Sequence, residues 1–184
     1  MEKQQDLIDA IVADHRAAAA LLDELEASGD ARNRGSLVER VITQLVRHAV
    51  AEEQYLYPAV REALPDGDEL ADHGLAGHAA AEQVMKELSR VDPATPVFDD
   101  LVGSLAASVR HHIQDAERDL LPRLRSACED AELRELGLKY EQGKKIAPTR
   151  PHPAVPDRPP ANKVLGPGMA LVDRIRDALT GRGR

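Results

Sequence analysis

The stretch HAVAEEQYLYPAVR (residues 48–61) decides the fold, because it recurs as HIQDAERDLLPRLR (residues 112–125). In both copies a histidine is followed at identical spacings by glutamate, leucine, proline and arginine. One further histidine, His15 or His78, precedes each copy at nearly the same distance. The chain therefore consists of two similar halves, and each half contains two histidines whose spacing has to be explained.

Four long segments around these histidines show the apolar periodicity of amphipathic helices. The first spans about residues 4–28, the second starts near Ser36, the third spans about residues 69–91, and the fourth starts after Thr95 and Pro96. Because the breaks between them (residues 29–35, 65–67 and 92–96) are short, neighbouring helices must be antiparallel. The sequence therefore predicts an all-α fold, an up-and-down four-helix bundle with one histidine per helix.

Beyond the bundle we expect three further features. A short fifth helix is predicted over residues 130–139, which completes a bundle domain of residues 1–146. Residues 147–168 form an extended arm, because seven of the twelve prolines fall within residues 148–167 and exclude a packed core. Residues 169–184 contain a short amphipathic helix, which we expect to dock onto the bundle or a partner subunit rather than a membrane.

Composition excludes several classes of protein. The net charge is −8 and no block of Lys and Arg occurs, so nucleic acid is not an expected partner. Aromatic residues make up only 2%, which leaves Leu, Val, Ile and Ala to build the core. The polar N-terminus does not resemble a signal peptide, no apolar run is long enough to cross a membrane, and Cys128 is the single cysteine. We therefore expect a cytoplasmic protein.

Four histidines share a position inside the apolar stripe of their helices: His15, His48, His78 and His112. A buried imidazole costs desolvation unless both ring nitrogens find partners. Glu52 and Glu82 add carboxylates one turn after two of these histidines, on the same helix faces. A bound cation would offset the burial of so many ionisable groups. Imidazole and carboxylate ligands without thiolate suit iron, manganese or zinc.

This series resembles the hemerythrin-like family of HHE cation-binding domains. Its pattern is a histidine, then His-x3-Glu, then a histidine with a second ligand four residues later, then His-x4-Asp or Glu. Here the series reads His15, His48-x3-Glu52, His78-x3-Glu82 and His112-x4-Glu117. The match spans residues 7–126, and the strings HAVAEE and HHIQDAE are typical of the bacterial branch of the family.

The resemblance implies a non-haem di-iron centre whose two iron ions share an oxo or hydroxo bridge. The implied ligands of one iron are His78, Glu82 and His112. Those implied for the other are His15 and His48, and the implied bridging ligands are Glu52 and Glu117.

Two departures from oxygen-carrying hemerythrin bear on function. Glu82 stands where that protein has a histidine, and Glu117 stands where it has an aspartate. An added anionic ligand stabilises ferric iron, which argues against reversible oxygen carriage. The resemblance therefore implies binding or reduction of small oxidants (O2, H2O2 or NO), with catalase-like activity as the enzymatic version, in oxidative or nitrosative stress or in iron handling. The alternative is a non-enzymatic iron or oxygen sensor, or a binding module, that signals through the C-terminal arm.

The choice of ligands on the fourth helix stays open. The five-residue step from His112 to Glu117 rotates about 140° in a regular α-helix, so the two share a face only if the helix contains a π-bulge. The pair His111 and Asp115 has the regular spacing of four. We prefer His112, because it lies in phase with the apolar stripe of its helix.

The second helix offers a similar choice. Glu53 matches Glu117 in the internal repeat, whereas Glu52 lies within the apolar stripe, and we prefer Glu52. Tyr55 follows Glu52 by three residues, so it is a candidate either to face the metal or to pack in the core.

Overall fold

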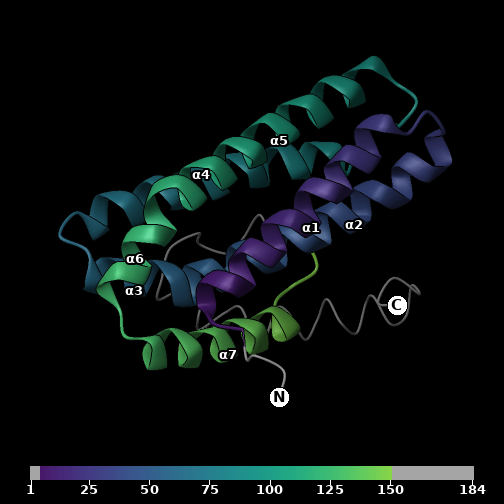
Figure 1. The fold of residues 1–184 in the computed structure, drawn as a ribbon. Coiled ribbons are helices and arrows are strands. Elements are labelled where there is room, and N and C mark those ends of the chain that lie inside the picture. The colour runs from purple at the N-terminus through teal and green to yellow at the C-terminus, as the bar shows by residue number, and fades with distance from the viewer. Residues whose placement is uncertain (1–4, 151–184) are drawn as a thin grey trace.

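The computed structural model describes residues 5–150, which form a helical bundle (Figure 1). Its helices, in chain order, are α1 (Leu7–Ala27), α2 (Ala31–Ala51), η1 (Glu52–Leu56), α3 (Tyr57–Ala63), α4 (Gly67–Leu88), α5 (Pro96–Asp115), η2 (Ala116–Leu120), α6 (Leu121–Ala127) and α7 (Asp130–Ile146). No strand occurs within residues 5–150. The predicted all-α fold is therefore confirmed, while most of the predicted arm and the whole C-terminal helix lie outside the described residues.

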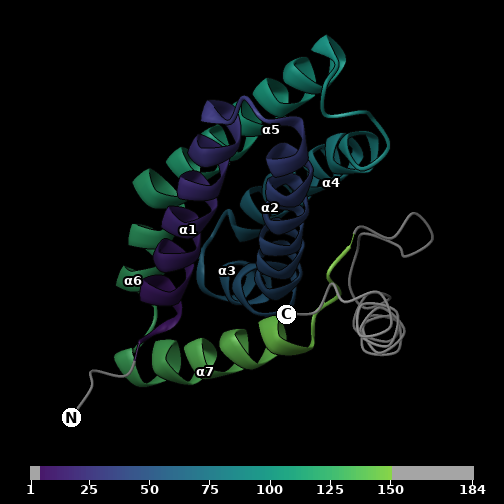
Figure 2. The same cartoon turned by 90° about the vertical axis from the view of Figure 1, so that its right-hand side faces the viewer.

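Four rods make up the bundle. Helices α2, η1 and α3 follow one another without a break, as do α5, η2 and α6, so each trio acts as one long helix. Helix α1 packs beside α2 and α5, and α4 packs beside α5 and α3, which closes the four rods into a ring. Figure 2 shows α7 crossing the lower end of this ring, where it contacts α1, α2 and η1.

Both long rods contain a π-helical turn at the same place in the internal repeat. In η1 the backbone N–H of Tyr57 donates to the backbone carbonyl oxygen of Glu52, and in η2 the N–H of Leu121 donates to that of Ala116. Each acceptor lies five residues before its donor. Each wide turn leads into a proline, Pro58 or Pro122, whose ring would clash inside a regular helix. The π-turn that we expected between His112 and Glu117 instead covers residues 116–120, and its counterpart at residues 52–56 follows His48 at the same spacing.

Two helices are longer than expected. Helix α2 begins at Ala31 rather than near Ser36, because the Asp30 carboxylate caps its N-terminus and accepts hydrogen bonds from the N–H groups of Arg32 and Asn33. Gly35 lies inside this helix, so it does not end the linker as we expected. Helix α7 likewise continues to Ile146, beyond the predicted end at residue 139.

The apolar core is divided in two. One cluster surrounds the N-terminal half of α1 and includes Leu7, Ile11, Leu56, Leu124 and Leu133. The other surrounds the opposite half and includes Leu22, Leu37, Met85, Phe98 and Leu105. The four histidines lie in the layer between the two clusters, as the positions of His15 between Ile11 and Ala18, and of His48 between Leu45 and Ala51, indicate.

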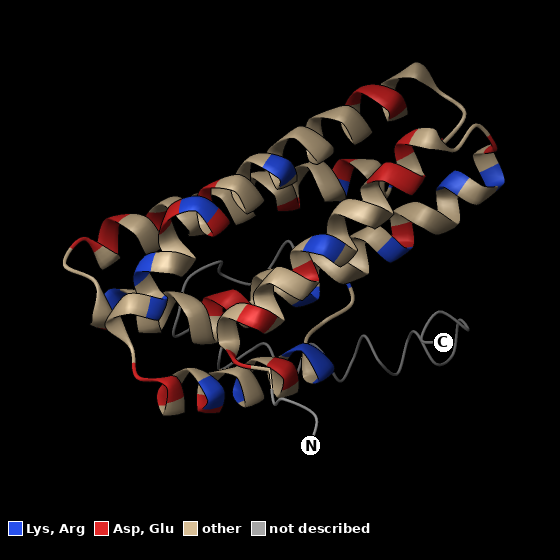
Figure 3. Cartoon of the chain, viewed as in Figure 1, with Lys and Arg blue, Asp and Glu red and all other residues tan. Residues whose placement is uncertain are grey.

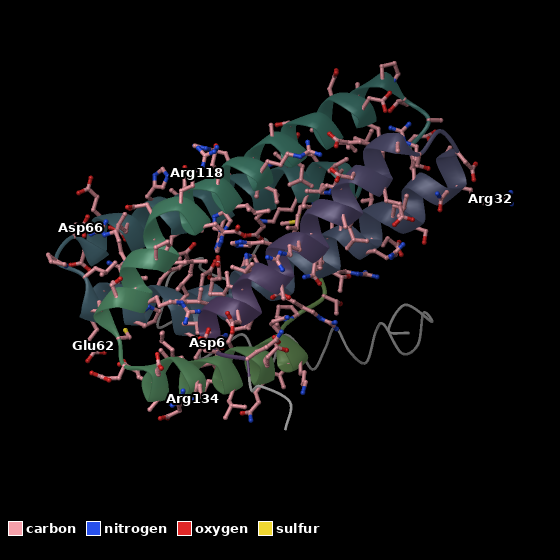
Figure 4. The ribbon with its side chains drawn as sticks, viewed as in Figure 1. Asp6, Arg32, Glu62, Asp66, Arg118 and Arg134 are labelled. Atoms are coloured by element: carbon pink, nitrogen blue, oxygen red, sulfur yellow. The ribbon has the colours of Figure 1, made fainter. Side chains whose placement is uncertain are left out.

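Figure 3 marks the Lys, Arg, Asp and Glu residues along the helices. Among those that the structure describes, the buried ones are Asp14, Glu52 and Glu53. The labelled side chains of Arg32, Glu62, Asp66, Arg118 and Arg134 in Figure 4 project away from the bundle, in agreement with their exposure. Within residues 5–150, none of the helices has the length and apolar character needed to cross a membrane.

Helix α7 approaches α1 closely because Gly137 has no side chain. A Cβ atom at this position would lie 2.7 Å from the carbonyl carbon of Asp6 and 2.8 Å from the backbone nitrogen of Leu7. These are backbone atoms that cannot rotate away, so a side chain here must push the two helices apart.

The variant Gly137→Ala is therefore expected to lower the free energy of unfolding by about 1–3 kcal/mol, the usual cost of overpacking. The matched control is Gly103→Ala on α5, where a Cβ atom meets nothing within 4 Å and the gain in helix propensity should raise stability by up to about 1 kcal/mol. Urea denaturation of both variants measures the difference. Equal stability of the two variants would contradict the proposed contact.

Candidate metal centre

All four histidines point the Nε2 atom of their ring at one carboxylate, that of Glu52. The distances from Nε2 to the nearest Glu52 oxygen are 3.9 Å for His15, 3.5 Å for His48, 3.1 Å for His78 and 3.3 Å for His112. Glu52 is fully buried. Each of the four rods therefore contributes one imidazole to the same point. The rod formed by α2, η1 and α3 also contributes the carboxylate.

The four rings fall into two closer pairs. The ring centroids of His15 and His48 are 5.0 Å apart, and those of His78 and His112 are 5.2 Å apart. The remaining measured separations range from 5.6 Å for His15 and His112 to 6.5 Å for His48 and His78. Each pair combines the two histidines of one half of the internal repeat.

The outer nitrogen, Nδ1, of three histidines is hydrogen-bonded to a group behind the ring. These contacts are His15 to Glu117 at 2.9 Å, His48 to Tyr140 at 2.8 Å, and His78 to Glu53 at 3.1 Å. A partner at Nδ1 fixes the ring orientation and leaves Nε2 to face inward. Metal-binding histidines in proteins are held in this way.

Several of the inward-facing atoms have no hydrogen-bond partner although they are buried. The unpartnered atoms are His15 Nε2, His48 Nε2, Glu52 Oε1 and His112 Nε2. These same four residues each offer one donor atom within 4.8 Å of the others. Buried polar atoms nearly always have a partner, and nitrogen lone pairs and carboxylate oxygens both bind cations. The donor set therefore fits a metal ion, which would satisfy all four atoms together.

Electrostatics at the centre favour a negative Glu52 and a neutral His15. Burial would raise the pKa of Glu52, but the neighbouring His48 and His112 hold it well below its usual range. Burial, and then the nearby His48, lower the pKa of His15 to about 4. At neutral pH the Nε2 lone pair of His15 is thus free to bind a cation.

His78 behaves differently in the metal-free protein. Burial alone would lower its pKa, but hydrogen bonds to Glu52 and Glu53 raise it to about 9. His78 therefore carries a proton between two carboxylates, and this positive charge compensates Glu52. A cation bound through His78 Nε2 would have to displace that proton.

The repeat explains the roles of two predicted carboxylates. Glu53 and Glu117 occupy equivalent positions in the two copies, and each contacts the Nδ1 atom of a histidine in the other half of the chain, His78 or His15. Glu52 has no equivalent, because Ala116 occupies its place in the second copy. The structure thus places Glu52 at the centre, and it places Glu53 and Glu117 behind the rings.

Three other candidates lie away from this centre. The Glu82 carboxylate pairs with Lys86 Nζ at 2.8 Å, and it is not among the donor atoms that cluster around Glu52. His111 and Asp115, the rival pair on α5, are both exposed and lie 3.4 Å from each other. The structure therefore brings His112, and not His111, to the other histidines.

Tyr57 is a residue of the centre that the sequence pattern did not predict. Its hydroxyl oxygen lies 3.4 Å from Glu52 Oε2 and 3.3 Å from His78 Nε2, so it is a further possible oxygen ligand. Burial, and then the charge of Glu52, raise its pKa well above the usual value. Tyr55, the residue we had considered, instead lies against Gly143 of α7. The wide η1 turn advances the helix phase so that Tyr57 faces Glu52.

A small cavity adjoins the four histidines. Its volume is about 40 Å³, and apolar side chains such as Leu45, Met85 and Val109 form much of its wall. A larger pocket of about 530 Å³ lies between α4 and the α5–η2 rod and shares Gly77 and His112 with this cavity. Both cavities therefore border these residues, and we expect small molecules to reach the centre through the larger pocket.

Comparison with known proteins agrees with this arrangement. The sequence model of the hemerythrin HHE cation-binding domain matches residues 6–124, which include all four histidines. The chain belongs to the hemerythrin HHE cation-binding family. A Mycobacterium kansasii protein that contains this domain has a crystal structure similar to ours, with a TM-score of 0.66 and 23% identity over 77% of this chain and 88% of that one. This likeness supports the fold.

Two further proteins are similar to this chain in sequence. An uncharacterized hemerythrin-like protein of Schizosaccharomyces pombe is 26% identical over 96% of this chain and 88% of its own length. A DNA nickase of Nostoc sp. (strain PCC 7120) is also 26% identical, over 78% of this chain but only 40% of the nickase. The match thus covers most of the length of one relative and less than half of the other.

The charge state of His78 gives a testable pH dependence for the metal-free protein. Its folded pKa of about 9 lies above the ordinary value of 6.5. The stabilisation is therefore complete below pH 6.5 and is lost as the pH rises through about 9. Denaturation in the presence of a chelator should show stability that falls across this range, and His78→Gln should remove the fall. A His78 titration by NMR with a midpoint near 6.5 would contradict this assignment.

Proposed function

We propose that this protein holds two iron ions without haem and binds or reduces small oxidants (O2, H2O2 or NO) in oxidative or nitrosative stress or in iron handling. The observation that carries the proposal is the convergence of four Nε2 atoms on the fully buried Glu52 carboxylate, with donor atoms that have no other partner. Imidazole with carboxylate and no thiolate is a ligand set that suits iron.

The pairing of the rings supports two ions rather than one. The pair His15 and His48 would hold one ion, and the pair His78 and His112 would hold the other. Glu52 lies between them, with Oε1 nearest to His15 and Oε2 nearest to the other three rings. This carboxylate would therefore serve both ions.

The shape of the centre supports a ligand of only a few atoms. When bound, iron would exchange electrons with a small oxidant at an open coordination position. The protein contributes the adjoining cavity of about 40 Å³, which has room for a molecule of roughly the size of water or O2. Leu45, Met85 and Val109 keep this space apolar.

Metal content tests the proposal directly. Protein produced with iron and purified in air should contain about two iron ions per chain, as di-iron bundles do. Glu52→Gln should lose most of this iron, because the amide cannot provide the negative charge between the ions. Glu82→Gln is the matched control and should keep it, since the Glu82 carboxylate pairs with Lys86. Equal loss in both variants would instead make Glu82 a ligand, and absence of iron from the wild-type protein would refute the proposal.

Access of small oxidants can be tested without touching a ligand. Gly77 is exposed, lines both the cavity and the larger pocket, and has open space where a Cβ atom would stand. Gly77→Leu should fit into the bundle and fill the route, which should slow oxidation of the ferrous protein by peroxide several-fold at unchanged iron content. Gly103→Leu, also in open space but outside both cavities, should react like wild type. Stopped-flow absorbance measures the rates, and an unchanged rate in Gly77→Leu would exclude this route.

A further inference from the structure

We propose that Tyr140 of α7 is a positioning residue for the metal centre: it holds His48 in the tautomer with its proton on Nδ1, so that the Nε2 lone pair faces Glu52. The inference rests on the proposed function for its importance in metal binding, but it concerns hydrogen bonds that exist without the metal. It also adds α7, the helix that crosses the end of the four-helix bundle, to the centre.

The geometry is a chain of three groups. The Tyr140 hydroxyl lies 2.8 Å from His48 Nδ1 and donates a hydrogen bond of 2.8 Å to Asp14 Oδ2. His48 Nδ1 is 3.7 Å from the same Asp14 oxygen, which is too far for a direct hydrogen bond. Tyr140 is fully buried and His48 and Asp14 are nearly so, so no solvent competes for these contacts.

The direction of the hydrogen bonds follows from Asp14. Its other carboxylate oxygen accepts hydrogen bonds from the Lys144 ammonium group at 2.5 Å and from the Gln44 amide at 3.4 Å. A carboxylate can only accept, so Tyr140 must give its single proton to Asp14. The tyrosine oxygen can then only accept from His48, and an N–H group on Nδ1 is the donor that it requires.

This direction has a consequence on the other side of the ring. A neutral imidazole with its proton on Nδ1 has a lone pair on Nε2. His48 Nε2 is buried, has no hydrogen-bond partner and lies 3.5 Å from Glu52 Oε2. Tyr140 thereby prepares the nitrogen that would bind the cation.

The packing of α7 serves this contact. Its buried positions include Leu133, Gly137, Tyr140 and Gly143, which lie on one face of the helix. At Gly137 the helix approaches the backbone of α1, and at Gly143 it approaches the ring of Tyr55. His15 and His78 receive their outer partners from η2 and η1, whereas His48 receives its partner from α7. Docking of α7 is therefore needed to complete the set.

The test compares Tyr140→Phe with Tyr55→Phe, a second tyrosine that contacts α7 but no histidine in the described contacts. Nitrogen NMR of the metal-free, full-length protein distinguishes the two imidazole tautomers. Wild type and Tyr55→Phe should show His48 with its proton on Nδ1, and Tyr140→Phe should shift the proton towards Nε2. Zn²⁺ affinity should fall by about 10–100-fold in Tyr140→Phe alone, as expected when the outer partner of a metal-binding histidine is lost.

A second variant keeps the tyrosine. In Asp14→Asn, Lys144 should donate to the amide oxygen, which leaves the NH₂ group to donate to the Tyr140 oxygen. Tyr140 must then donate its proton to His48 Nδ1, so the proton of His48 should again move to Nε2. This isosteric change decides the question if Tyr140→Phe does not fold. Retention of the Nδ1 proton in both variants, or equal Zn²⁺ affinity of Tyr140→Phe and Tyr55→Phe, would overturn the proposal. If wild type bound no metal, the proposed function would fail, but the tautomer measurement would still test the role of Tyr140.

Discussion

The structure depends on the burial of one carboxylate, that of Glu52. Moving an ionised carboxylate out of water costs several kcal/mol unless positive charge and hydrogen bonds compensate it. In the metal-free protein the surrounding imidazoles supply this compensation, and His78 is hydrogen-bonded to both Glu52 and Glu53. A bound cation would take over the same task. The four helices must therefore meet around Glu52 with their imidazoles inward, and the layer of histidines separates the two apolar clusters of the core.

The fold could be predicted because its determinants are local. Apolar periodicity predicted the long helices. The repeat of His48 and His112, each followed by a proline, predicted two equivalent halves. The start of α2 was wrong, since the cap at Asp30 lies before a glycine that we took as part of the linker. The cap at Asp30 is a short-range signal, and it places the start of the helix before the start that we predicted near Ser36.

The centre could be predicted only in part. The in-phase positions of the four histidines indicated a common focus, and the stripe favoured Glu52 over Glu53. Tyr57 was missed because the π-helical turn changes the phase of the helix after Glu52, although Pro58 could have signalled it. Tyr140 contacts His48 from a helix far along the chain, and no spacing rule connects the two.

The internal repeat is incomplete at the centre itself. Glu52 and Tyr57 in the first copy correspond to Ala116 and Leu121 in the second, while Glu53 and Glu117 are equivalent. Both halves have thus kept an equivalent carboxylate behind the histidine rings. In the first half alone, a further carboxylate and a phenol face the centre. The two coordination positions that we propose would therefore be chemically unequal, because the phenol lies on the side of His78. The electron density at the centre would therefore be distributed unevenly along the axis that joins the two halves. An incoming small molecule would for the same reason prefer one end of this axis.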